Sequence, residues 1–166
     1  MSKQVLVGSF LFLLLSSSLL AEDTEMERNT LKGLKRMRVV VKLPDFISDQ
    51  FSTAALNIQV ELKLRMVGIN VLPVEEWKNA AGWPCLEMVV DGMKNKDSNG
   101  YFFNLELMLV QEVVLSRNNS IILLAPTWST GKMLRASSDV MLQFLKTKID
   151  ELLDEFANAY LSVNPK

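Results

Sequence analysis

Alternating apolar and polar residues predict strands in several parts of the chain. The clearest case runs from Arg36 to Leu43, where every second residue is apolar and Pro44 follows. Two shorter apolar stretches, Ile69–Leu72 and Leu86–Val90, also favour strands over helices because of their length and their flanking residues. These three stretches supply the first half of a predicted sheet.

A longer alternation, Tyr101–Arg117, predicts one strand of about 55 Å at 3.3 Å per residue. Few strands reach this length, so we expect a bulge or bend near Gln111. Asn118–Asn119 can adopt the positive φ angles of a tight hairpin, and Ile121–Trp128 is therefore predicted to pair back antiparallel. The composition of Asp91–Gly100, with its Gly, Asn, Asp and Ser residues, predicts a turn or loop before this hairpin.

A helical period dominates the C-terminal part of the chain. Between Leu142 and Tyr160, apolar residues recur every three or four positions and charged residues lie between them. This pattern predicts an amphipathic helix of about 24 residues, about 36 Å long. We expect Ser137 or Ser138 to cap its start and Pro165 to end the chain after it.

The segment Ser52–Val67 is ambiguous, because its apolar residues alternate as in a strand while its composition is typical of a helix. Ser52 or Thr53 can cap a helix, and Gly68 stands where a helix would end in a left-handed residue. We therefore predict a helix that is buried broadly and has only a narrow solvated face. Pro73–Trp77 predicts the first turn of a short helix, closed by Gly82.

The resulting order, β-α-β-β-β-β-α, indicates an α+β fold. We expect a mainly antiparallel sheet of about five strands with two main helices packed on one face. Residues 36–166 are predicted to form a single domain, and residues 22–35 a loosely ordered leader, because Glu22–Asn29 is acidic and has no period.

The first 21 residues predict a cleaved signal peptide. Lys3 provides a positive start, Val5–Leu15 an apolar stretch, and Ser16–Ala21 an end with small residues. The stretch is too short to be a typical transmembrane helix, which needs about 20 apolar residues. Since the only cysteine, Cys85, lies far away, we do not expect a lipoprotein. The sequence thus predicts a soluble protein that is exported from the cytoplasm.

Composition excludes several classes of function. The chain has no histidine, which removes Ser–His and Cys–His nucleophile pairs and the commonest zinc ligand. Thr130–Lys132 resembles the end of a phosphate-binding loop, but Pro126 and Met133 occupy positions that this loop needs for glycine and for a hydroxyl. A formal net charge of −1 gives no reason to expect a nucleic acid as partner. We therefore expect neither a cofactor nor a metal.

These exclusions favour a protein that is not an enzyme. The alternative is a hydrolase or transferase with a histidine-free site, built on Ser129 with Lys132 or on carboxylates. The carboxylates in question are Glu106, Glu112, Glu151, Asp154 and Glu155. On strand and helix faces next to lysines, such residues more often serve solvation than catalysis.

Basic residues suggest one surface that could bind a partner. No acidic residue interrupts the run Arg28, Lys32, Lys35, Arg36, Arg38 and Lys42. Arg36, Arg38 and Lys42 share one face of the first predicted strand, which could dock on anionic lipid or another envelope polymer. The alternative is an edge strand that its charges keep soluble and unpaired.

Aromatic residues suggest a second surface. Trp77, Trp83 and Trp128 lie near predicted loop or strand ends, and Tyr101 starts a strand. They could line a groove for a peptide, glycan or lipid, although core packing is the more frequent role of such residues. A homodimer joined through the last helix or through Cys85 is a third interpretation.

Several short motifs resemble a family of small exported bacterial proteins with no assigned activity. They are Glu61–Arg65 with Gly68, Ile69 and Val71, then Gln111, Glu112, Leu115 and Arg117, then Thr127–Trp128, Phe156, and the ending Tyr160–Lys166. The resemblance covers about residues 53–166 and implies a bacterial, periplasmic or secreted product. The order of elements also looks like small α+β modules of bacterial envelope assemblies, including the N-terminal domain of the TolB type. We therefore expect a non-catalytic binding or envelope-complex accessory module whose partner is an envelope protein, lipid or glycan.

Overall fold

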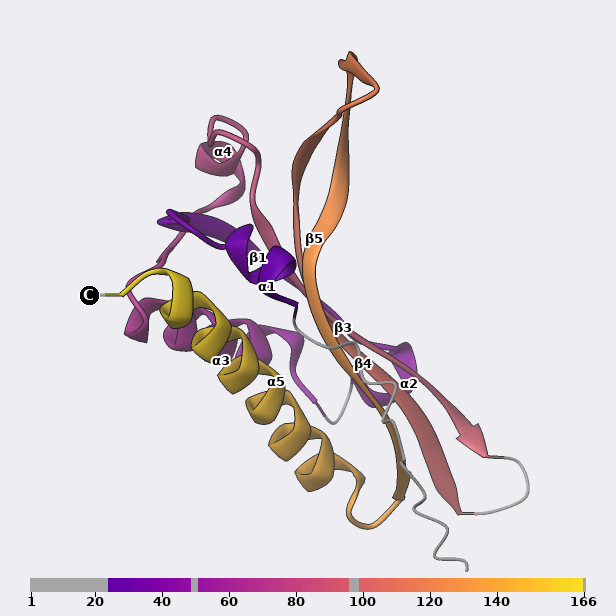
Figure 1. The fold of residues 1–166 in the computed structure, drawn as a ribbon. Coiled ribbons are helices and arrows are strands. Elements are labelled where there is room, and N and C mark those ends of the chain that lie inside the picture. The colour runs from indigo at the N-terminus through magenta and orange to yellow at the C-terminus, as the bar shows by residue number, and fades with distance from the viewer. Residues whose placement is uncertain (1–23, 49–50, 96–98, 166) are drawn as a thin grey trace, which may run out of the picture.

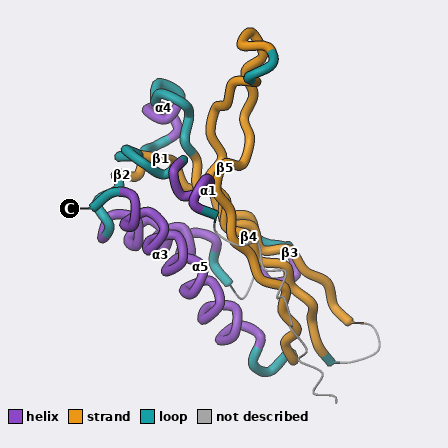
Figure 2. Tube along the Cα trace, in the orientation of Figure 1, coloured by secondary structure: helices purple, strands orange, loops and turns teal. Residues whose placement is uncertain are grey.

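The computed structural model describes residues 24–48, 51–95 and 99–165. The predicted signal peptide, residues 1–21, lies outside them. One curved five-stranded sheet forms the centre of the described part, and two long helices cover one of its faces (Figure 1; Figure 2). The elements, in chain order, are α1 (Glu25–Asn29), β1 (Arg36–Lys42), α2 (Asp45–Ser48), α3 (Thr53–Met66), β2 (Asn70–Val71), α4 (Val74–Trp77), β3 (Cys85–Asn95), β4 (Gly100–Leu115), β5 (Asn118–Ser137) and α5 (Met141–Val163).

The strands lie in the order β2-β1-β3-β4-β5. β1 pairs in parallel with β2 and with β3, because helical crossovers connect these strands, whereas β3, β4 and β5 form an antiparallel meander. The sheet is therefore mixed, and its long strands are antiparallel. This confirms the predicted α+β class and, if the three shortest helices are set aside, the predicted order of elements.

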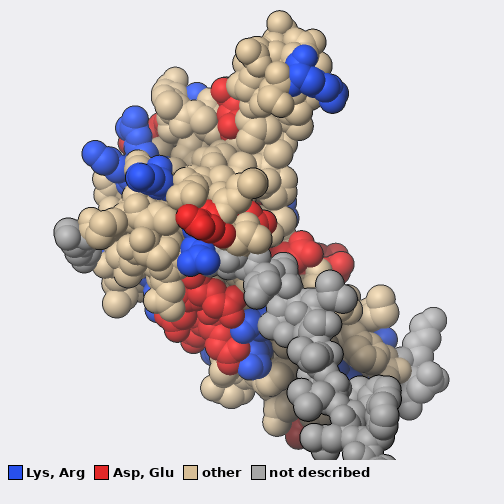
Figure 3. All heavy atoms as spheres, in the orientation of Figure 1, with Lys and Arg blue, Asp and Glu red and all other residues tan. Residues whose placement is uncertain are grey.

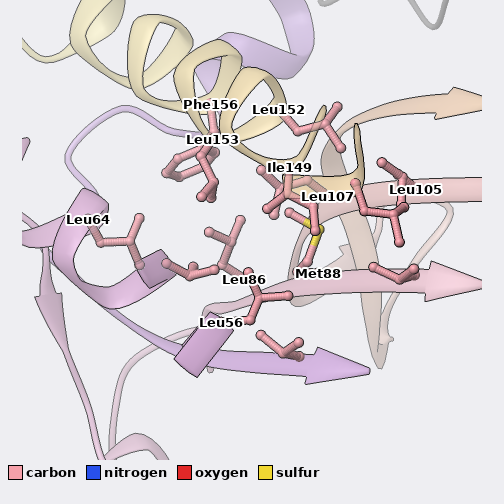
Figure 4. Packing of buried hydrophobic residues seen from close by; sticks show 14 of the residues in the cluster. Leu56, Leu64, Leu86, Met88, Leu105, Leu107, Ile149, Leu152, Leu153 and Phe156 are labelled. Carbon is pink, nitrogen blue, oxygen red and sulfur yellow. The ribbon is translucent and has the colours of Figure 1, made fainter. Parts of the chain in front are cut away.

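The hydrophobic core lies between the sheet and the helices α3 and α5. Leu105 and Leu107 of β4 point toward Ile149, Leu152 and Phe156 of α5 (Figure 4). All five side chains are fully buried. Burial of one such side chain stabilises a fold by about 1.5–3 kcal/mol, so this layer dominates the favourable side of the folding free energy.

Helix α3 follows the predicted composition signals. The Ser52 side chain accepts a hydrogen bond from the Ala55 N–H, and Gly68 has φ +94° just after the helix. The expectation of broad burial is wrong, however. Leu56, Val60 and Leu64 face the core, whereas the apolar residues on the opposite side are exposed. Among the described residues, one sheet face and α5 are the elements that cover this helix, so its second side remains exposed.

Three strand and helix ends differ from the prediction. β3 extends to Asn95, because pairing of Asn95 with Gly100 continues the ladder through residues whose composition is typical of loops. β5 continues to Ser137, well beyond Trp128, because β4 offers a partner along its whole length. α5 begins after Val140 without a side-chain cap, since Ser137 still belongs to β5.

The segment before β1 is ordered from Thr24 onward, in contrast to the loose leader that we expected. Thr24 and Glu27 form a reciprocal capping box that starts α1. Leu31 is fully buried, and the Asn164 side-chain amide donates to its carbonyl oxygen over 3.0 Å. Tyr160 Oη donates to the Leu34 carbonyl oxygen over 2.9 Å. Burial and hydrogen bonds to the end of α5 therefore fix this segment. The spacing of Thr24 and Glu27 is a local signal for the start of α1, whereas a local pattern cannot indicate the contacts with α5.

Candidate interaction surfaces

A β-hairpin arm projects from the body of the molecule. We call residues 112–124 the arm; they comprise the end of β4, the hairpin turn and the start of β5 (Figure 1). The arm starts above an irregularity in the ladder, where Leu109 pairs with Trp128 and Val110 pairs with Pro126. Thr127 is thus the extra residue of a bulge, close to the bend that the sequence predicts near Gln111.

Hydrogen bonds fasten the bulge to the body. The Gln111 side-chain amide donates to Thr127 Oγ1 over 2.8 Å, and Thr30 Oγ1 donates to the Thr127 carbonyl oxygen over 3.2 Å. The Glu112 N–H donates to the Gly82 carbonyl oxygen over 2.7 Å. The base of the arm is therefore held from two sides, and the direction in which the arm leaves the sheet is fixed.

Apolar side chains are exposed on both faces of the arm. Val114 pairs with Ile122, and Val113 pairs with Leu123, so each pair occupies one face. The exposed fraction is 52% for Val114 and 58% for Ile122. Ile121, Leu123 and Leu124 are also exposed. In Figure 3 the arm is mostly uncharged, with basic atoms near its tip and acidic atoms at its base.

The charged residues of the arm are Glu112 at its base and Arg117 in its turn. The arm therefore has an apolar middle between polar ends. A signal for this feature exists in the sequence, because Ile121–Leu124 is a run of four apolar residues without alternation. We predicted this run as part of a strand that pairs back antiparallel, which the structure confirms, and the structure adds that the side chains of the run are exposed.

Two of the predicted aromatic residues meet beside the base of the arm. The ring centroids of Trp77 and Trp83 are 6.1 Å apart, and the Arg38 guanidinium lies 5.2 Å from the centroid of Trp77. Trp77 Nε1 donates to the Pro84 carbonyl oxygen over 3.0 Å. We call Arg38, Trp77 and Trp83 the tryptophan corner. It unites three of the seven residues that the sequence singled out.

Trp83 is the exposed member of the tryptophan corner, with 42% of its surface accessible. Its φ of +45° is the only positive value among the described residues other than glycine. A bulky residue rarely adopts this conformation, which costs about 1–3 kcal/mol and is often found at functional positions. The hydrogen bond from Glu112 to the neighbouring Gly82 helps to hold it there.

The remaining aromatic candidates do not form a groove. Trp128 is 1% exposed and packs edge-on against Phe156 in the core. This agrees with core packing, which the sequence analysis considered the more frequent role, and excludes the alternative of an accessible partner-binding role for this residue. Its inward position on β5, next to the bulge, explains this burial. Tyr101 is half-buried and stacks on Phe46, with ring centroids 5.4 Å apart, at the other end of β4.

The basic face of β1 is divided among different partners. Lys42 forms an ion pair with Glu87 on β3, and Arg38 belongs to the tryptophan corner, while Arg36 is exposed. β2 pairs only with Arg36 and Met37, so most of β1 has an open edge. One side of β1 pairs with β3. The other side is open beyond Met37, so the expectation of a charged edge strand holds for that part of β1.

Lys132 lies in a network of ion pairs between β5 and α5. Its Nζ atom is 2.8 Å from Glu155 and 3.0 Å from Glu151, and Thr130 Oγ1 donates to Glu155 over 2.6 Å. Burial alone would lower the pKa of Lys132, but hydrogen bonds to Glu155 and Glu151 outweigh it and raise the pKa. This amine therefore stays protonated at neutral pH and is unsuited to act as a base.

Ser129 is not brought into a dyad with Lys132. Ser129 pairs with Met108 on the uncovered sheet face, whereas Lys132 pairs with Leu105 on the helix-covered face. Both residues border an open hollow of about 690 Å³ that reaches around the edge of β5. Among the described residues, no group of three or more Cys, Asp or Glu side chains could hold a metal ion.

Cys85 is buried at the start of β3. Burial, together with the nearby Glu87, raises the pKa of its thiol to about 11. This environment disfavours the intermolecular disulfide that the sequence allowed. Within the described ranges, no helix combines the length and the low polarity that crossing a bilayer requires.

Comparisons with known proteins give little further information. No family model matches the chain, and no curated protein matches it. Among solved structures, the chain is similar to a single-residue variant of PelC from Paraburkholderia phytofirmans, described as a dodecamer. The two are 17% identical, with a TM-score of 0.43, over 74% of this chain and 86% of that one. Similarity at this level carries no argument about function.

Proposed function

We propose that this chain is an exported, non-catalytic interaction module of the bacterial envelope, and that its arm binds a partner protein. The observation that carries the proposal is the exposure of apolar side chains on both faces of the arm. A projecting hairpin contributes little to its own core, so exposed Val, Ile and Leu side chains are a cost unless a partner covers them.

The polar ends of the arm favour a protein over a lipid surface. A lipid layer would receive the turn first, and the turn contains Arg117 among polar residues. Transfer of such a charge into an apolar medium is unfavourable. A partner protein can instead cover the apolar middle on both faces and leave Arg117 in solvent or opposite an acidic group.

The tryptophan corner extends this candidate interface. Trp83 lies next to the residue that holds the base of the arm, and tryptophan and arginine are enriched among residues that dominate binding energies. The strained backbone of Trp83 keeps a large side chain half in solvent. We therefore assign the partner a surface that contacts both the arm and Trp83.

The placement of the candidate catalytic groups supports a role without catalysis. Lys132 is held as a cation by two carboxylates, and Ser129 lies on the opposite sheet face. The alternative of a hydrolase or transferase built on this pair therefore gains no support from the geometry.

Export rests on the sequence of residues 1–21. We expect the chain recovered from a periplasmic extract to begin after the apolar stretch. Mass spectrometry of its N-terminus checks this, and a chain that keeps Met1 and is recovered from the cytosol would contradict export.

Variants of the arm test the interaction. The double variant Ile122→Asp/Leu124→Asp removes apolar surface from one face of the arm. Met93→Asp/Met133→Asp is the matched control, because both methionines are exposed apolar residues of the sheet outside the arm. Each variant replaces the wild-type chain in the source bacterium, and native gradient sedimentation of the envelope extract gives the size of the complex.

We expect the wild-type chain and the methionine control to sediment in a complex larger than a dimer, and the arm variant to sediment free of it. If the arm variant stays in the same complex, or if the wild-type chain sediments free, the proposal is refuted.

A further inference from the structure

Helix α3 carries a line of exposed apolar side chains that the fold does not cover. Ile58 is 59% exposed, Leu62 57% and Met66 74%. They follow one another at intervals of four residues and therefore form one ridge along the helix. We call these three residues the α3 stripe. It lies on the side of α3 away from Leu56, Val60 and Leu64, which face the core.

A shallow hollow accompanies the α3 stripe. The stripe residues border it together with Ala55 and Leu153, and Leu153 comes from α5. Its volume is about 330 Å³. An apolar ridge next to a hollow of this kind can pack against a second helix, with the ridge of one helix entering the groove of the other.

Both borders of the α3 stripe are charged, and each contains acidic and basic groups. On one side, Glu61 and Arg65 form an ion pair within the helix at 3.2 Å. On the other side, Lys63 forms an ion pair with Asp154 of α5. Leu62 lies at the centre of this arrangement, with Ile58 and Met66 at equal separations before and after it.

Along the border formed by Glu61 and Arg65, this arrangement is complementary to itself. A two-fold axis through Leu62 would place a second copy of α3 antiparallel to the first, with Ile58 opposite Met66 of the other copy. Residues on one border then meet the same border of the other copy, so that Glu61 approaches Arg65 of the second chain and Arg65 approaches its Glu61. An isologous contact of this kind needs no further protein.

From this complementarity we infer that α3 is the contact of a symmetric homodimer, with the α3 stripe of a second copy of this chain as its occupant. This inference goes beyond the proposed function and does not depend on the arm. It also differs from the dimer through the last helix that the sequence suggested, because the apolar side of α5 is buried within its own chain.

The dimer is a weak one. The 14 residues of α3 span about 21 Å, and a helix face is about 10 Å wide, so one copy buries a few hundred Å². Stable complexes bury about 800 Å² per partner. We therefore expect a monomer at low concentration and a dimer at the high local concentration of an assembly.

Analytical ultracentrifugation of the chain over about a hundred-fold concentration range tests the inference. We expect a reversible monomer–dimer equilibrium, and Leu62→Glu should raise the dissociation constant at least about ten-fold because two carboxylates would meet at the axis. Ile122→Glu is the matched control, because Ile122 is 58% exposed on the arm and should leave the equilibrium unchanged. Circular dichroism verifies that both variants are folded.

Charge exchange tests the pairing of the borders. Glu61→Lys and Arg65→Glu should each weaken the dimer, and the double variant should restore it, because each copy again offers one acid and one base. A wild-type chain that remains monomeric throughout, or a dimer that Leu62→Glu leaves intact, would overturn the inference. A dimer that only Ile122→Glu disrupts would assign self-association to the arm and would likewise overturn it.

Discussion

Trp128 and Trp83 show how two residues of the same type take opposite roles in this molecule. Trp128 fills the core against Phe156, while Trp83 remains half in solvent beside the arm. We expect iodide to quench the fluorescence of Trp83 strongly and that of Trp128 weakly. Chains that retain a single tryptophan separate the two signals. Equal quenching of both would contradict the burial of Trp128.

Truncation of Trp128 should also be costly. Replacing a buried tryptophan by alanine removes apolar contacts and leaves a cavity, so Trp128→Ala should lower the free energy of unfolding by about 3–5 kcal/mol. Denaturant titration measures this loss. A change below about 1 kcal/mol would show that the Trp128 environment is looser than the structure indicates.

The pKa shift of Glu151 predicts a dependence of stability on pH. Hydrogen bonds from Lys148 and then from Lys132 lower the pKa of Glu151 below its ordinary value of 4.5 in the folded chain. A carboxyl with a lowered folded pKa stabilises the fold above its unfolded pKa and loses this contribution as the pH falls through the folded pKa. The network should therefore weaken only in acid.

Lys132→Met tests this linkage. We expect the free energy of unfolding to fall less steeply in this variant than in the wild-type chain between about pH 5 and about pH 2. Lys148→Met should have a similar effect, because the hydrogen bond from Lys148 makes the largest contribution to the lowered pKa of Glu151. If the free energy of unfolding falls equally steeply with decreasing pH in the wild-type chain and in both variants, these ion pairs do not contribute to the pH dependence.

At the scale of elements, the start of α3 offers a direct test of local sequence signals. The Ser52 side chain caps the helix, so Ser52→Ala should lower the free energy of unfolding by about 1 kcal/mol. Ser137→Ala is the comparison, because Ser137 lies in β5 and caps no helix. We expect that variant to change stability by less than about 0.5 kcal/mol. Equal losses in chemical denaturation would contradict this assignment.

Local patterns predicted the elements well wherever a residue's own neighbours decide its conformation. The capping of α3 by Ser52 and the alternation in β4 are examples. Local patterns did not predict the ends of strands or the order of a segment where contacts with residues distant in the sequence decide them. β3 reaches Asn95 and β5 reaches Ser137 because β4 lies beside both strands. The segment from Thr24 to Lys35 is ordered because Tyr160 and Asn164 of α5 hold it.

Most side chains of the arm are exposed and therefore contribute little to the core. Ile122→Asp/Leu124→Asp should change the free energy of unfolding by no more than about 1 kcal/mol, because both side chains are exposed. Leu107→Ala, in the core, should cost about 2–5 kcal/mol. If the arm variant were as unstable as Leu107→Ala, the apolar arm would be part of the folding core.

At the scale of the whole molecule, the arm and the α3 stripe are two separate groups of exposed apolar residues, and other apolar residues such as Met93 and Met133 are exposed elsewhere on the sheet. The sequence could predict that these residues are apolar but not that they stay uncovered, because this depends on which sheet face and which helix face have a partner. Of the residues selected from the sequence, the structure brings Arg38, Trp77 and Trp83 together, and their role in binding stays a prediction. Trp128 has the core position that the sequence analysis considered the more frequent role, and its burial excludes the alternative of an accessible binding residue.

Site-specific photocrosslinking in the source bacterium tests the role of the arm most directly. A photoreactive residue placed at Ile122 should form one discrete adduct with another protein, and the same residue at Met133, on the sheet face, should not. Substitution of Leu124 by Asp in the Ile122 probe should abolish the adduct. If Ile122 and Met133 give the same products, or if Ile122 links only to a second copy of this chain or to lipid, the arm does not bind a partner protein.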